Sequence, residues 1–208
     1  GVATAYVDST SMIVFTGETH SYSLGRGIFQ EIDRQVWADF FSIMRPVVKR
    51  TWNVSRVDQL PRVLPDAFRW ALTGRPGPVH ITLPMDVQTD SIETEIPEPL
   101  LHRPSGRIRP DPEKILEAAT LLSKAERPAI VAGGGVILAD ASQELINLAE
   151  FIGAPVVTTL MGKGAIPEDH PLSAFYAGAK GSDVGNKVTQ GADVIIAVGM
   201  RFSDQSTS

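Results

Sequence analysis

Glycines gather directly after predicted strands in the second half of the chain, where they could bring backbone N–H groups close to a ligand. The segment 132–136 reads Ala-Gly-Gly-Gly-Val, and segments 158–161 and 199–202 also end predicted strands. A glycine loop that leads into a helix favours an anion such as phosphate. A plain tight turn explains the same pattern equally well. The dinucleotide-binding fingerprint is absent, because position 138, where its third glycine would fall, is Leu.

Two further residues at these strand ends have open interpretations. Arg201 would either clamp a phosphate or pair with a surface carboxylate, whereas a lone methionine such as Met161 ordinarily packs in a core. Because ligands of open parallel sheets sit beyond the carboxyl ends of the strands, the convergence of these segments favours a nucleotide cleft.

Polar and acidic residues crowd one loop and the start of a predicted helix in the first half of the chain. The simplest interpretation of Glu31 and Asp33 is that they complement the dipole of that helix. No nucleophile elbow and no zinc-binding spacing accompany them. The crowded positions are Glu18, His20, Gln30, Glu31 and Asp33.

The segment 74–86 indicates how the first block is built. Gly74 is suited to end a helix, Pro76 and Pro78 cannot continue one, and 79–83 is typical of a short buried strand that Pro84 closes. Arg75 lies at the rim of this unit. Upstream, we predict a helix at the first residues, a strand over 12–16, a helical segment beginning at 29–32, and a helix over 57–72 that Pro65 would kink.

The second block alternates between strands and helices. Asp111 and Pro112 are suited to begin a helix over 113–125. We then predict a strand over 128–132, a helix over 141–152, a strand over 155–160, a loop over 162–181, a helix over 182–190 and a strand over 193–199. This order is typical of an α/β fold, with parallel sheets flanked by helices.

Composition narrows the classes of function. The chain has 208 residues, 43% of them hydrophobic and 21% charged, which is ordinary for a globular protein. A net charge of -5 without a basic cluster argues against nucleic acid and a membrane as partners. The chain has no cysteine, so disulfides and thiolate chemistry are excluded, and we expect a cytoplasmic location.

An ordered set of short motifs runs through essentially the whole chain. They are Gly1-Val-Ala-Thr-Ala-Tyr-Val-Asp-Ser9, Gly27-Ile-Phe-Gln-Glu-Ile-Asp33, Arg45-Pro-Val-Val-Lys49, Gly74-Arg-Pro-Gly-Pro-Val79, Ala132-Gly-Gly-Gly-Val136, Thr159-Leu-Met-Gly-Lys-Gly164 and Gly199-Met-Arg-Phe202. Taken in this order, the motifs resemble segments of acetolactate synthase and related thiamine-diphosphate-dependent enzymes.

This resemblance implies a division into two domains. Residues 1–88 would be the C-terminal half of a pyrimidine-binding domain, 89–112 a linker rich in Pro and charged residues, and 113–208 an incomplete, Rossmann-like central domain. The family's catalytic glutamate would precede Gly1, and its Gly-Asp-Gly…Asn magnesium motif does not occur. We therefore expect a fragment of a carboligase or decarboxylase of 2-oxo acids, a transferase or lyase that is inactive alone.

The resemblance also implies cofactors, partners and site residues. The full protein would use thiamine diphosphate and Mg²⁺ and would form a homodimer or homotetramer, and its central domain is compatible with a structural FAD. Gln30 and Lys49 match active-site positions. The positions that match FAD contacts of acetolactate synthases are Arg75, Gly133, Gly134, Gly135, Thr159, Leu160, Met161, Gly178, Gly181, Arg201 and Asp204.

Three departures from the acetolactate synthase pattern stand out. The stretch 34–44 is longer than usual, Met85 replaces a lysine, and Gln205 replaces an arginine. These departures leave related activities open, namely a sulfoacetaldehyde acetyltransferase, a trihydroxycyclohexanedione hydrolase or an oxalyl-coenzyme-A decarboxylase. A non-catalytic module that binds FAD or ADP is a separate, second hypothesis.

Overall fold

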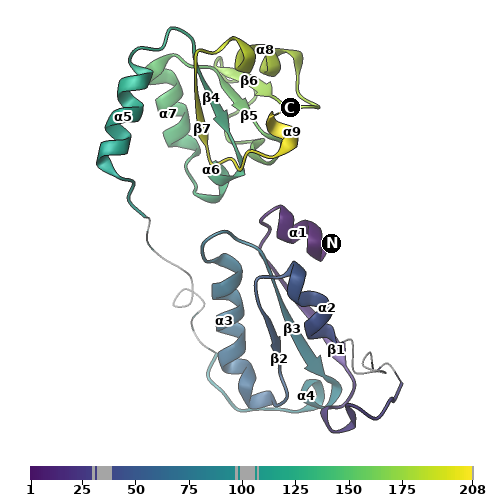
Figure 1. Ribbon diagram of the computed structural model, residues 1–208. Coiled ribbons are helices and arrows are strands. Elements are labelled where there is room, and N and C mark those ends of the chain that lie inside the picture. The colour runs from purple at the N-terminus through teal and green to yellow at the C-terminus, as the bar shows by residue number, and fades with distance from the viewer. Residues whose placement is uncertain (30, 32–38, 97, 99–105, 107, 208) are drawn as a thin grey trace. The chain divides into compact units, whose positions relative to one another are not determined.

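The structure is a computed structural model that describes residues 1–29, 31, 39–96, 98, 106 and 108–207. The chain divides into two compact units, Gly1–Arg107 and Ile108–Ser208. Each unit holds its own parallel sheet and its own apolar core (Figure 1). None of the helices in the described ranges is long and apolar enough to cross a membrane.

The first unit is a three-stranded parallel sheet in the order β1-β3-β2. Figure 1 shows α3 on one side of these strands and α1 and α2 on the other. The elements of this unit are α1 (Val2–Val7), β1 (Met12–Glu18), α2 (Phe40–Met44), β2 (Thr51–Asn53), α3 (Leu60–Leu72), β3 (Pro78–Pro84) and α4 (Met85–Thr89).

The core of the first unit lies between α3 and β3. Val63, Ala67 and Ala71 recur at helical spacing and are buried against Val79 and Ile81 of the strand. Pro61 occupies the first turn of α3, where a missing N–H breaks no helical bond. The helix continues through Pro65, at which we predicted a kink, without interruption.

The second unit is a four-stranded parallel sheet in the order β6-β5-β4-β7. Its core is formed by the central strands together with α7. The elements are α5 (Pro112–Leu122), β4 (Pro128–Ala132), α6 (Gly134–Leu138), α7 (Ser142–Ile152), β5 (Val156–Thr158), β6 (Ser173–Tyr176), α8 (Asp183–Gly191), β7 (Val194–Val198) and α9 (Asp204–Thr207).

The α/β fold with parallel sheets is confirmed, and most predicted elements are present. Asp111 begins α5 as predicted, since its carboxylate accepts the N–H of Glu113 at 2.9 Å. The strand predicted over 155–160 is shorter and ends at Thr158.

The predicted loop over 162–181 is wrong in part, because it contains β6. Phe175 of this strand has φ +60°, and the register with β5 shifts between Val156 and Thr158. These irregularities remove the regular alternation by which a strand is recognised. The short elements α2, β2, α4, α6 and α9 were also not predicted. Of the helical segment expected to begin at 29–32, Phe29 and Glu31 are not helical, and Gln30 and Ile32 lie outside the described residues.

Candidate functional site

The carboxyl ends of β4, β5 and β7 approach one another so closely that glycine is required there. A Cβ on Gly133 would lie 2.4 Å from the carbonyl oxygen of Gly199, and one on Gly162 would lie 2.1 Å from that of Ala132. A Cβ on Gly135 would lie 2.6 Å from the Cα of Gly199. Because these neighbours are backbone atoms, no side-chain adjustment would relieve the contacts. The glycines therefore bring the strand ends into backbone contact.

In this arrangement, most of the N–H groups of residues 133–135 already donate to backbone carbonyls. Gly133 donates to the carbonyl of Val198 at 2.8 Å, and Gly135 donates to that of Gly199 at 2.8 Å. Gly134 is the first residue of α6, and a residue at this position has no helical acceptor for its N–H. The geometry thus favours the tight-turn interpretation of the segment over a cradle formed by all three N–H groups.

The segment after β5 combines a buried threonine with two exposed apolar side chains. The hydroxyl of Thr159 accepts the N–H of Gly162 at 3.2 Å, and the Thr159 N–H donates to Ala132 at 2.9 Å. Leu160 is 71% exposed and Met161 is 50% exposed. Met161 is therefore not a core residue. Core packing was the ordinary expectation for a lone methionine.

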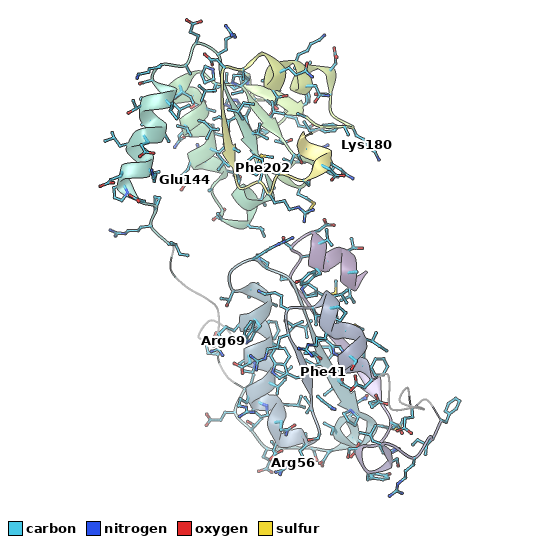
Figure 2. All side chains as sticks on the ribbon, viewed as in Figure 1. Phe41, Arg56, Arg69, Glu144, Lys180 and Phe202 are labelled. Carbon is cyan, nitrogen blue, oxygen red and sulfur yellow. The ribbon has the colours of Figure 1, made fainter. Side chains whose placement is uncertain are left out.

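A third exposed apolar side chain follows β7. Phe202 is 65% exposed and has φ +53°, a left-handed conformation that is unfavourable for a bulky residue. It lies on the segment that leaves the sheet beside α9, where Figure 2 labels it. Arg201, on the same segment, is exposed. We call Leu160, Met161 and Phe202 the apolar rim of the second unit.

Gly178 and Gly181 shape the loop between β6 and α8. The N–H of Gly178 donates to the side-chain oxygen of Asn186 at 2.9 Å, and the N–H of Gly181 donates to Gly178 at 2.7 Å. Gly178 has φ +119°, and a Cβ there would lie 1.8 Å from the carbonyl oxygen of Gln205. This contact places the loop against α9, which begins at Asp204. Gln205 therefore packs against this loop through its backbone carbonyl.

In the first unit, Lys49 and Arg75 are both engaged around the turn that precedes β3. Lys49 Nζ donates to the carbonyls of Thr73 at 2.6 Å and Arg75 at 2.8 Å. Its side chain packs against Gly77, where an added Cβ would lie 3.0 Å from Lys49 Cδ. Burial lowers the pKa of the Lys49 amine. In this structure Lys49 therefore ties the end of α3 to the turn.

The guanidinium of Arg75 fastens the same turn to the end of α1. Its Nε donates to Ser9 Oγ at 2.7 Å, and one terminal nitrogen donates to the carbonyl of Val7 at 2.6 Å. A cation at this place also complements the carboxyl end of the α1 dipole. The contacts described for Arg75 lie within the first unit, whereas the glycine cluster belongs to the second.

The loop after β1 is organised by carboxylates. Glu31 is 3% exposed, and its carboxylate accepts the N–H groups of Gly25, of Gly27 at 2.5 Å and of Ile28 at 3.1 Å. The bond from Gly25, followed by those from Gly27 and Ile28, lowers the pKa of this carboxyl group. The contacts of the Glu31 carboxylate are thus with the preceding loop, and the helix that it was expected to complement falls outside the described residues. The sequence pattern Gly-x-Gly, followed four residues later by Glu, could have indicated these contacts.

A second carboxylate fastens the beginning of this loop. Asp86, in the first turn of α4, accepts the Ser21 N–H at 2.9 Å and the Ser21 hydroxyl at 2.5 Å. The hydroxyl, followed by the N–H, lowers the pKa of Asp86. The predicted site residue Gln30 and the residue Asp33 lie outside the described residues.

The comparisons with known proteins find a family that the second unit resembles. Residues 115–208 match the family described as the central domain of thiamine pyrophosphate enzymes. The predicted positions from Gly133 to Asp204 fall within this range, whereas Gln30, Lys49 and Arg75 precede the matched residues.

The whole chain is similar to acetolactate synthase large subunits. It is 44% identical over 211 residues to a protein named as a probable acetolactate synthase large subunit of Methanocaldococcus jannaschii, covering 100% of this chain and 35% of that protein. It is 39% identical to the acetolactate synthase large subunit of Corynebacterium glutamicum, covering 99% of this chain and 32% of that protein. The chain thus spans about a third of the length of these relatives.

The fold is shared with a solved structure. Benzoylformate decarboxylase from Polynucleobacter necessarius superimposes with a TM-score of 0.76 at 25% identity, covering 98% of this chain and 37% of that one. The match covers nearly all of the chain, so the parallel α/β sheets described above are of the kind found in that structure.

Proposed function

We propose that the chain is part of a thiamine-diphosphate-dependent carboligase or decarboxylase of the acetolactate synthase type, a transferase or lyase that acts on 2-oxo acids. The observation that carries this proposal is 44% identity over the whole chain to an acetolactate synthase large subunit. Thiamine diphosphate, when bound, supplies a carbanion that adds to the keto carbon of a 2-oxo acid and allows carbon dioxide to leave.

The role proposed for this chain is to orient the cofactor and substrate rather than to bind the metal. The Gly-Asp-Gly…Asn magnesium motif of the family does not occur in this sequence. We therefore place Mg²⁺ and the diphosphate on another part of the full protein, and we expect the chain alone to be inactive. Gln30 remains the proposed contact with cofactor or substrate.

Lys49 supports the turn before β3 in this proposal. Its amine already donates to two backbone carbonyls, so a direct role in the reaction would require those bonds to be exchanged. We infer that its substitution affects the reaction mainly through the position of this turn.

For the second unit we propose a nucleotide site in which the apolar rim receives a planar ring such as that of FAD. The exposure of Leu160, Met161 and Phe202 supports this proposal. The N–H groups of Gly133, Gly135, Gly178 and Gly181 already have acceptors within the unit and do not fit a diphosphate cradle. Any diphosphate would have to be bound by other donors at this edge, among which we propose Gly134, Thr159 and Arg201. Asp204, whose carboxylate only accepts hydrogen bonds, would contact a donor group of the nucleotide such as a hydroxyl.

The deciding experiment uses the full-length protein. Incubated with thiamine diphosphate, Mg²⁺ and pyruvate, the protein should form acetolactate, and omission of thiamine diphosphate should abolish the product. If acetolactate does not form although the cofactor binds, the acetolactate synthase assignment is wrong. Sulfoacetaldehyde, the cyclic dione and oxalyl-coenzyme A are then the substrates to test.

The remaining parts of the proposal have separate tests. Thermal denaturation with FAD, ADP and coenzyme A examines the nucleotide site, which is refuted if none of the three raises the melting temperature. Sedimentation of the full-length protein examines the proposed homodimer or homotetramer. Cell fractionation examines the proposed cytoplasmic location.

A further inference from the structure

The loop that follows β1 is not held in place by apolar packing. Most of its large apolar side chains are exposed, with Tyr22 at 66%, Leu24 at 42% and Phe29 at 84%, and Ile28 is half-buried. Apolar burial, the usual source of stability in a loop, therefore contributes little here. Some other interaction has to fix the backbone of residues 19–29.

Hydrogen bonds to the Glu31 carboxylate supply that interaction. Gly25 has φ +81° and Gly27 has φ +67°, conformations that glycine adopts without strain. Backbone in which left-handed residues alternate with others directs successive N–H groups toward a common point, which is an anion-binding arrangement. Here the anion is the side chain of Glu31, so this arrangement is not available to a ligand.

Both the side chain and the backbone of Glu31 bond to the preceding loop. While the Glu31 carboxylate accepts from Gly25, Gly27 and Ile28, the Glu31 N–H donates to the carbonyl of Ile28 at 3.1 Å. The other end of the loop is tied to α4 by Ser21 and Asp86. The loop backbone is thus fixed at both ends by carboxylates that are buried or half-buried, and Phe29 follows directly from the fixed part.

We propose that Glu31 is a positioning residue, whose carboxylate fixes the backbone of residues 25–28 and thereby sets where the adjoining Phe29 is presented to the reaction. This inference rests on the proposed function, because the segment Phe29-Gln30-Glu31 resembles the active-site segment of the family. It assigns Glu31 no contact with substrate or cofactor.

The test compares Glu31→Gln with Glu31→Asp and with a control, Glu95→Gln, in the full-length protein. Glutamine has nearly the same shape as glutamate but offers one oxygen and an N–H donor, so it cannot accept all three N–H groups. Aspartate keeps the charge and both oxygens on a shorter side chain. Glu95 is exposed and lies outside the helices and strands.

In hydrogen exchange, the amides of Gly25, Gly27 and Ile28 should exchange at least about tenfold faster in Glu31→Gln, since losing 1.4 kcal/mol of local stability corresponds to a factor of ten. The amides of β3 and the melting temperature should match those of Glu95→Gln. Acetolactate formation should lose on the order of 100-fold in kcat with little change in KM, the size expected when a reacting group is misplaced. Glu31→Asp should recover part of both losses.

Each outcome decides between the alternatives. If the loop amides of Glu31→Gln exchange as in the wild type, Glu31 does not fix the loop and the inference is wrong. If they exchange faster while kcat equals that of Glu95→Gln, Glu31 is structural and positions nothing for the reaction. If the wild type forms no acetolactate, the proposed function fails, and the exchange data still decide whether Glu31 fixes the loop.

Discussion

Replacement of Gly133 by alanine tests whether the glycine cluster serves packing. Gly133 has φ -97° and ψ 179°, an extended conformation that any residue adopts, so backbone strain does not penalise alanine there. The added Cβ would lie 2.4 Å from the Gly199 oxygen, 2.6 Å from Met200 Cα and 2.8 Å from the Gly199 carbonyl carbon. Ordinary contact begins at 3.4 Å, so α6 or the end of β7 would have to move by about 1 Å.

That movement determines the size of the effect. Overpacking of this kind costs about 1–3 kcal/mol. The displacement would also stretch the bonds from Gly133 to Val198 and from Gly135 to Gly199, each worth about 1 kcal/mol. We therefore expect the free energy of unfolding of the second unit to fall by about 3–5 kcal/mol. For a unit of this size the corresponding fall in melting temperature is more than about 12 °C.

The assay is calorimetric unfolding of the wild type, Gly133→Ala and the control Gly191→Ala. An added Cβ at Gly191, the last residue of α8, would meet nothing within 4 Å. This control should be neutral or more stable by up to about 1 kcal/mol, because alanine is the better helix former. If Gly133→Ala melts within a few degrees of Gly191→Ala, packing does not explain the glycine at 133. Access of a ligand to the backbone is then the better explanation for this glycine.

The remaining predictions concern both units. His80 is fully buried, with its ring nitrogens bonded to Thr16 at 2.8 Å and Thr51 at 2.6 Å, and burial lowers its pKa. The folded state therefore favours neutral His80. Its contribution to stability is complete above pH ~6.5 and is lost as the pH falls toward the lower folded-state pKa. Urea unfolding at pH 7 and pH 5 should show this loss in the wild type but not in His80→Gln, and an equal loss in both would contradict it. Lys49→Met should lower the free energy of unfolding of the first unit by about 1–3 kcal/mol, through loss of two bonds from a charged donor. Lys124→Met is the exposed control in the same denaturation measurement. Leu160→Asp should remove at least half of any thermal shift produced by FAD, because a charged group on the apolar rim disfavours a planar ring. An unchanged shift would place the nucleotide elsewhere.

The strands β3 and β4, which pair with a neighbour on both sides, could be predicted from local sequence. Their residues are mostly apolar, and glycine or proline lies at their ends. β3 begins after Gly77 and ends at Pro84, and β4 has the predicted bounds of 128–132. Asp111 marked the start of α5 through a capping bond that depends on adjacent residues alone. Where the apolar pattern of a segment and the residues at its ends predict the same element, the structure contains that element.

The elements that sequence did not predict depend on contacts with distant residues. α6 begins in glycines, which are poor helix formers, and its first turn is supported by bonds to the end of β7 more than sixty residues later. β2 is three residues long and is defined by its pairing with β3. Likewise, the buried role of Glu31 depends on the left-handed backbone of Gly25 and Gly27, which residue type permits but does not dictate.

The candidate nucleotide site illustrates how a position can match a family's cofactor contacts without offering the cofactor a hydrogen bond. The N–H groups of Gly133 and Gly135 donate to carbonyls at the end of β7 and are not available to a cofactor. These same bonds bring the ends of β4 and β7 into contact. Gly162 does the same for β4 and β5. The segments carrying Leu160 and Phe202 consequently leave from one edge of the sheet. Glycine substitutions should therefore weaken nucleotide binding and stability together, whereas substitutions on the apolar rim should weaken binding alone. Calorimetry and FAD titration of Gly133→Ala and Leu160→Asp separate the two, and loss of binding at unchanged stability in Gly133→Ala would show that this glycine contacts the ligand after all.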